Sequence, residues 1–155
     1  MHMSAANNTL HARSRERGFS LLEILVALLV LSIGLLGLAS LQATTSRFNY
    51  AAYLRSQATS LTYDMADRMR ANRDEALAGS YDAAAFPNPA PVCGAVAGAT
   101  VSERDLSGWQ SALACALPGG MGRIVRNAST VTIGVSWDDS RGEAVPEIFE
   151  MTTSL

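Results

Sequence analysis

The sequence of 155 residues contains no lysine, and all twelve of its basic residues are arginine. The two histidines, His2 and His11, lie close to the amino terminus. Histidine-dependent nucleophilic catalysis, HExxH zinc sites and lysine Schiff bases therefore lack their essential group in the rest of the chain. Carboxylate chemistry remains open, but no pair of acids forms a recognisable motif. The composition predicts a protein that is not an enzyme and that needs no cofactor.

Positive charge is concentrated at the start of the chain. Arg13, Arg15 and Arg17 stand there with a single acid, Glu16, whereas the remainder carries nine arginines against thirteen acids. A body with net negative charge lacks the basic surface that nucleic-acid binding normally needs. We therefore expect no nucleic-acid partner.

A long apolar run follows the basic leader. Residues 24–46 contain no charged side chain. About 20 residues are enough to cross the hydrocarbon core of a bilayer as a helix, and the preceding arginines favour a cytoplasmic amino terminus. Glu23 stands at the beginning of this run. A carboxylate inside a membrane helix is costly, roughly 2.5–3.5 kcal/mol at the centre, so its presence calls for a partner.

Three interpretations of this segment compete. The segment is a Sec signal cut near residues 39–43, a plain single-pass anchor, or a helix that follows a cut between Gly18 and Phe19. The third interpretation explains Glu23. A cut after Gly18 would leave an α-ammonium on Phe19, and a carboxylate one turn along a neighbouring helix would neutralise that charge. Gly18, Phe19 and Glu23 are therefore the candidate processing and docking residues, and no residue is assigned to catalysis or to a metal.

Beyond the apolar run, the chain continues as an amphipathic helix. Its apolar positions recur at steps of three and four residues: Leu54, Ala58, Leu61, Met65 and Met69. We therefore expect one helix from Phe19 to Ala71 or Ala78, capped by Asn72 or Gly79.

The opposite side of this helix carries charged residues. The spacing of Asp64 with Arg68, and of Arg70 with Asp74, predicts two ion pairs between residues four positions apart.

A shorter helix is predicted after a loop rich in proline, glycine and alanine. Ser102 and Asp105 match a capping box at its start, and Pro118-Gly119-Gly120 would end it. An apolar stripe runs along it, formed by Leu106, Trp109, Leu113 and Leu117.

Three strands are expected in the last third of the chain, at residues 124–125, 130–137 and 147–153. The middle strand alternates cleanly, with Val131, Ile133, Val135 and Trp137 on one face. Together the elements predict an α+β fold in which the long helix packs against a small antiparallel sheet, with one short extra helix.

Cys93 and Cys115 are the two cysteines of the chain. Cys93 lies in the loop, and Cys115 lies opposite the centre of the apolar stripe on the short helix, so it should point away from the core. A disulfide between them would explain this position, with two free thiols as the alternative. Such a bond is permitted outside the cytoplasm and would stabilise the fold by about 3 kcal/mol.

A group of acids lies near the end of the middle strand. Asp138, Asp139 and Glu143 do not follow the spacing of an EF-hand loop, so we expect a solvated turn and no metal.

The stretch Gly18-Phe19-Ser20-Leu21-Leu22-Glu23, after a short basic leader, resembles the class III signal of type IV pilins and type II secretion pseudopilins. The resemblance implies that prepilin peptidase cuts between Gly18 and Phe19 and methylates the new Phe19 amine. It also implies that Glu23 aligns incoming subunits. The chain would then comprise a leader (residues 1–18), the hydrophobic half of the helix (19–46), and the amphipathic half with a globular domain (47–155).

Further segments, residues 66–72, 105–120 and 131–138, are similar to the PilV family of minor pilins. This similarity implies a low-abundance subunit that helps to prime type IV pilus assembly at the tip. The implied partners are other minor pilins, the major pilin, prepilin peptidase and the assembly platform. The implied location is the inner membrane, crossed once with the globular domain in the periplasm, and later the pilus.

Two alternatives remain at this point. A type II secretion minor pseudopilin carries the same kind of signal, and the genes beside this one would distinguish it. An adhesive or DNA-binding module displayed on the pilus is the second alternative. The absence of proline from the apolar run argues against the major subunit, because many major pilins have a kinking proline there.

Overall fold

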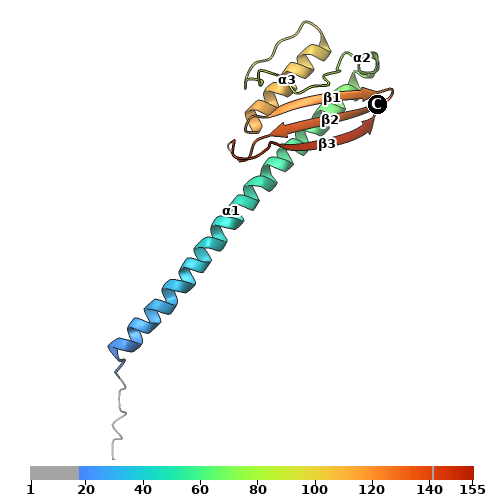
Figure 1. Cartoon of the computed structure of the whole chain (residues 1–155). Helices are drawn as coiled ribbons and strands as arrows, with labels where there is room; N and C mark the ends of the chain where they lie inside the picture. The colour runs from blue at the N-terminus through green and yellow to red at the C-terminus, as the bar shows by residue number, and fades with distance from the viewer. Residues whose placement is uncertain (1–17, 141) are drawn as a thin grey trace, which may run out of the picture. The chain divides into compact units, whose positions relative to one another are not determined.

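The computed structural model describes residues 18–140 and 142–155, so the leader residues 1–17 lie outside the described part. The described elements are, in order, α1 (Leu21–Ala71), α2 (Arg73–Ala78), α3 (Val101–Ala116), β1 (Met121–Asn127), β2 (Thr130–Trp137) and β3 (Glu147–Ser154) (Figure 1). The chain divides into two compact units, Met1–Thr44 and Thr45–Leu155.

The first unit contains the apolar start of α1. All of its described residues are exposed, and α1 is, within the described chain, one helix long and apolar enough to cross a membrane. Ser20 caps this helix: its Oγ accepts a hydrogen bond of 3.3 Å from the backbone N–H of Leu22. A serine at this position satisfies a backbone donor that the first turn leaves free. The helix therefore begins at Leu21, two residues later than expected.

The carboxyl-terminal end of the long helix lies in the second unit. One uninterrupted helix was expected, but the structure has a break and a second short helix. Helix α1 ends at Ala71, Asn72 adopts φ −117° and ψ 50°, and α2 then runs to Ala78. Gly79 follows with φ 95°, a left-handed conformation in which a glycine has no Cβ to clash. Both predicted end points therefore occur. Helix α1 ends before Asn72, and α2 ends before Gly79.

The interruption also changes the ion pairs on the exposed side of α1. Arg68 pairs with Asp64 over 2.9 Å, as predicted. The prediction for Arg70 is wrong, because Arg70 pairs with Asp67 over 2.8 Å. Asp74 lies beyond the break in the helix, so the regular four-residue spacing no longer brings it to Arg70.

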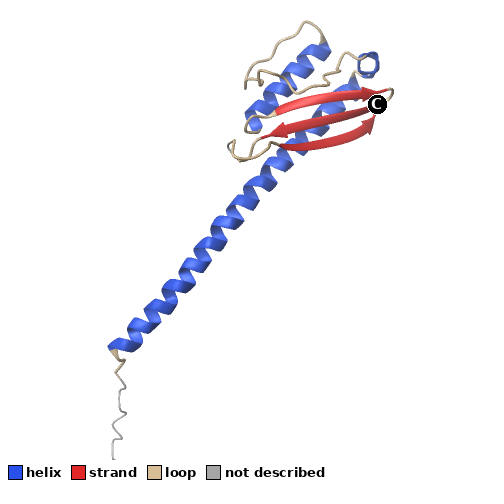
Figure 2. Ribbon diagram, in the orientation of Figure 1, coloured by secondary structure: helices blue, strands red, loops and turns tan. Residues whose placement is uncertain are grey.

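The three strands form one antiparallel sheet in the order β1-β2-β3 (Figure 2). Ile133 at the centre of β2 faces Ile124 of β1 and Met151 of β3. The predicted middle strand coincides with β2, and its four alternating residues are all buried. Strand β1 is longer than the expected two residues, because the whole of it pairs with β2.

The start of α3 corrects the predicted capping box. The hydroxyl of Thr100 accepts a bond of 3.2 Å from the N–H of Glu103, and the Glu103 carboxylate accepts one of 3.1 Å from the N–H of Thr100. The box is thus two residues earlier than the expected pair Ser102 and Asp105. Asp105 instead contacts Tyr81 and Arg68, which lie outside α3.

Trp109 of α3 connects the helices to the sheet. Its indole N–H donates a bond of 2.9 Å to the carbonyl of Leu61 on α1. Its ring lies over Gly122 of β1 so closely that a Cβ there would come within 2.2 Å of it. Both helices therefore pack on the inner face of the sheet. The buried core includes Leu54, Met65, Met69, Leu113, Ile124, Val131, Ile133, Val135 and Trp137.

Candidate processing and assembly site

Gly18 and Phe19 precede the first turn of α1 in a segment that is neither helix nor strand, and both are exposed. Among the described residues other than its chain neighbours, no atom lies within 4 Å of the place a Cβ would take on Gly18. An exposed, irregular peptide is the kind of segment that a protease can enter. The Gly18–Phe19 bond is therefore accessible for cleavage, whereas the bonds after Leu21 are protected by the helix.

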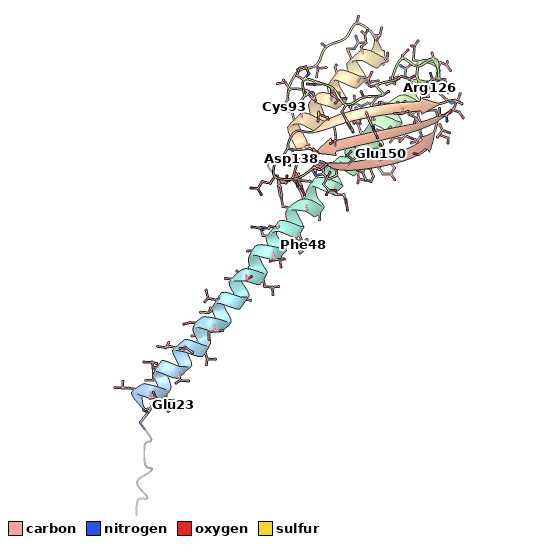
Figure 3. The ribbon with its side chains drawn as sticks, viewed as in Figure 1. Glu23, Phe48, Cys93, Arg126, Asp138 and Glu150 are labelled. Atoms are coloured by element: carbon pink, nitrogen blue, oxygen red, sulfur yellow. A yellow bond between two sulfur atoms is a disulfide. The ribbon has the colours of Figure 1, made fainter. Side chains whose placement is uncertain are left out.

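Glu23 lies in the first turn of α1, where the exposed N–H groups of the helix favour a negative charge (Figure 3). Its surroundings are apolar. It lines a shallow hollow of about 440 Å³ together with Phe19, Ile24, Ala27, Leu28 and Leu31. Within residues 18–140 and 142–155, no cation forms an ion pair with this carboxylate. The geometry leaves Glu23 available to a positive charge on another molecule.

In the second unit, a disulfide joins Cys93 to Cys115. Cys115 is exposed on α3, while Leu113 and Leu117 on the same helix segment are buried. The bond therefore lies on the outer side of α3 and attaches the loop before that helix to its last turn.

The same face of α3 holds the loop at three further points, which the sequence reasoning missed. The Ser111 hydroxyl accepts a bond of 2.8 Å from the N–H of Gly94. The Ser107 hydroxyl accepts one of 3.0 Å from Ala97, and the Glu103 carboxylate one of 2.7 Å from Ala99. Glu103, Ser107, Ser111 and Cys115 recur every four residues, so this face was visible in the sequence as a polar stripe.

The hydrogen bonds between the Glu103 carboxylate and the loop also change the pKa of Glu103. The N–H groups of Thr100 and Ala99 donate to its carboxylate, and they hold the pKa of Glu103 below its usual value. The charged form of this side chain is therefore the form that fits the folded loop.

A buried tyrosine links the break in α1 to α3. The Tyr81 hydroxyl donates a bond of 2.7 Å to Asp105 and accepts one of 3.1 Å from the Asn72 amide. Asp105 in turn pairs with Arg68 over 3.3 Å. Burial of the phenol, followed by the contact with Asp105, raises the pKa of Tyr81. This network is structural, and no local sequence pattern indicated it.

The acidic turn after β2 is organised by its own hydrogen bonds. Asp138 accepts from the N–H of Ser140 over 2.8 Å and from its hydroxyl over 2.7 Å. In the part of the chain that the structure describes, no group of three or more histidine, cysteine or acidic residues is placed to hold a metal ion.

Comparison with known proteins adds one result to this geometry. Residues 13–39 match a family model described as the prokaryotic N-terminal methylation motif. No curated protein and no solved structure matches the chain. The matched residues include Gly18, Phe19 and Glu23 with most of the apolar run. The motif therefore supports a type IV pilin-like or pseudopilin-like substrate of prepilin peptidase.

Proposed function

We propose that this protein is a minor pilin that takes part in starting type IV pilus assembly. In this proposal, prepilin peptidase cuts the chain between Gly18 and Phe19 and methylates the new amine of Phe19. The observation that carries the proposal is the place of Glu23, a single acid on the first turn of an exposed apolar helix, inside a matched methylation motif.

The cut would create a charge that Glu23 is suited to bind. The new α-ammonium of Phe19 remains positive after methylation, and it lies at the tip of a hydrophobic helix. When such helices associate, that charge leaves water and needs a partner in a region of low polarity. The Glu23 carboxylate of a neighbouring subunit, held by the helix start and surrounded by apolar side chains, would supply it. This pairing would align an incoming subunit with those already assembled.

The proposed location follows from the same segment. The charge-free residues 24–46 would cross the inner membrane once, with the arginine-rich leader in the cytoplasm. The globular domain would then lie in the periplasm and afterwards in the pilus. The disulfide between Cys93 and Cys115 agrees with an oxidising compartment. The proposed partners are prepilin peptidase, the assembly platform, the major pilin and other minor pilins.

The choice of a PilV-like pilus subunit rests on the similarity of residues 66–72, 105–120 and 131–138 to that family. A type II secretion minor pseudopilin shares the amino-terminal motif and is the alternative. Deletion of the gene separates the two. Loss of surface pili and twitching with normal protein secretion supports the pilus subunit, and the opposite pattern supports the pseudopilin.

The first experiment is to determine the amino terminus of the chain recovered from membranes or sheared pili, by intact mass and terminal-peptide mass spectrometry. A chain that begins at N-methylated Phe19 is the expected result. A chain that begins near residues 39–43 would identify a conventional secreted domain and would remove the role proposed for Glu23.

A further inference from the structure

The segment of α1 that follows the charge-free residues is unusually rich in exposed aromatic side chains. Phe48 is 71% exposed, Tyr50 51% and Tyr53 56%. All three precede Leu54, the first buried residue of the helix, and Figure 3 marks Phe48 on this segment. We call these three residues the aromatic belt. A packed domain alone gives no reason to keep three large rings in water.

The side chains of the belt lie on two opposite sides of the helix. With 3.6 residues per turn, Tyr50 and Tyr53 lie about 60° apart on one side, and Phe48 lies on the other side, about 160° from Tyr50 and about 140° from Tyr53. A single partner helix or groove contacts one stripe of a helix, so it would not cover Phe48 and Tyr50 together. A lipid layer surrounds a helix and contacts all of its sides.

The positions of the belt along α1 also suit a lipid layer. Phe48, Tyr50 and Tyr53 lie about 3, 6 and 10 Å beyond Ser46, the last residue of the charge-free segment. Helical side chains lean towards the amino terminus, which brings the rings back towards that segment. The head-group layer on each side of a bilayer is about 5–7 Å thick, and tyrosine and other amphipathic aromatics concentrate there.

The charges next to the belt agree with this boundary. Arg47 is exposed beside Phe48 and forms none of the ion pairs in the described part of the chain, so its guanidinium can reach a lipid phosphate. A hollow of about 870 Å³ is lined by Arg47, Phe48 and Tyr50 together with the acids Asp138, Asp139 and Glu143. Acidic side chains favour water over an anionic lipid surface, so the lipid contact should end at this loop.

From these observations we infer that Phe48, Tyr50 and Tyr53, with Arg47, bind the phospholipid head-group layer on the periplasmic face and set the depth of the chain in the membrane. The inference rests on the proposed membrane anchoring. It assigns a membrane-contacting role to residues that the processing motif does not include, since the matched motif ends at residue 39.

Tryptophan substitutions test the depth directly. Phe48→Trp, Tyr50→Trp and Tyr53→Trp each add a fluorophore to the processed chain, reconstituted in vesicles of phosphatidylethanolamine with a minor fraction of phosphatidylglycerol. The native Trp109 and Trp137 are buried and supply a constant background. Tyr63→Trp is the matched control, because Tyr63 is 54% exposed on the same helix but lies about 15 Å further along it than Tyr53.

We expect lipids brominated near the head group to remove most of the emission added at positions 48, 50 and 53, and lipids brominated near the chain end to remove less. The emission added at position 63 should not fall. Belt tryptophans that are quenched no more than position 63, or that are quenched most by deep bromines, would overturn the inference while processing and membrane recovery remain normal. A chain that is not recovered with membranes would overturn the proposed anchoring as well.

Discussion

The hydroxyl of Tyr81 donates a hydrogen bond of 2.7 Å to the carboxylate of Asp105, which lies 24 positions further along the chain. The bond joins the residues after α2 to the first turns of α3. Because Asp105 also pairs with Arg68 of α1, one partly buried carboxylate holds three parts of the domain together. A network of this kind is costly to break in part, since a partly buried acceptor would lose its donor.

Tyr81→Phe should lower the free energy of unfolding by about 1.5–3 kcal/mol, the usual range for a hydrogen bond to a charged group. Denaturant unfolding of the full chain in detergent, followed by tryptophan emission, measures this loss. Tyr63→Phe is the control, because Tyr63 is exposed, and it should change little. Equal stability of the two variants would show that the network contributes nothing.

The same tyrosine should make stability depend on alkaline pH. Its pKa is raised in the folded protein above the unfolded value of about 10. The stability that this neutral phenol contributes is complete below about pH 10 and is lost as the pH rises through the folded pKa. Tyr81→Phe should therefore lose less stability than the parent above about pH 10. Identical alkaline decline in parent and variant would contradict this prediction.

The disulfide should account for a measurable share of the stability of the domain. Replacing both cysteines, Cys93→Ser with Cys115→Ser, should lower the free energy of unfolding by about 3 kcal/mol, because the unfolded chain regains the freedom of the closed loop. Denaturation of the parent with and without reductant gives an independent value. Ser107→Ala, which removes the bond to Ala97 but leaves the disulfide, should cost only about 1 kcal/mol. If reductant does not change the free energy of unfolding of the parent, the disulfide has no stabilising role.

Two glycine substitutions should change stability in opposite directions. In Gly122→Ala the new methyl would meet the Trp109 ring at 2.2 Å, so we expect a loss of about 1–3 kcal/mol from overpacking. In Gly108→Ala the nearest atoms are 4.0 Å away, and alanine is preferred to glycine within a helix by up to about 1 kcal/mol. Thermal unfolding followed by circular dichroism compares the two. A stable Gly122→Ala variant would mean that Trp109 has room to move.

Glu23 should be needed for assembly but not for processing. In Glu23→Gln the side chain keeps its size and loses its charge, so it would no longer neutralise the ammonium of a neighbouring Phe19. We expect normal cleavage, judged by the intact mass of the chain recovered from membranes. We also expect most of the protein to be lost from sheared pili, judged by immunoblot. Glu143→Gln, a neutralised exposed acid in the second unit, should behave as the parent. Normal incorporation of Glu23→Gln would remove the docking role.

Gly18 should be needed for processing itself. Gly18→Phe places a bulky side chain at the proposed cut, where we expect the peptidase to need a small residue, so the full-length chain should accumulate in membranes. Gly34→Ala is a control within the apolar run, because no atom lies within 4 Å of its added Cβ. Cleavage of Gly18→Phe at the parental rate would place the processing site elsewhere.

Several features could be predicted from local patterns because they depend on neighbours a few residues away. The apolar run and Glu23 are visible as a charge-free stretch with one acid at its start, and β2 is visible as strict alternation. The helical stripe through Leu113 and Leu117 shows three- and four-residue steps, which also indicate that Cys115 faces outwards.

The tertiary structure decided what depends on residues far apart in the chain. Asn72 interrupts α1 where its amide bonds to Tyr81, a partner that no helical pattern specifies. The capping box lies at Thr100 and Glu103 rather than at Ser102 and Asp105, because Asp105 accepts from Tyr81 and Arg68. Local sequence patterns are therefore sufficient to identify the amino-terminal motif and the types of the main elements. The break at Asn72 and the network of Tyr81, Asp105 and Arg68 were decided by hydrogen bonds between distant residues, whose free energy exceeds the small local preferences that compete with them.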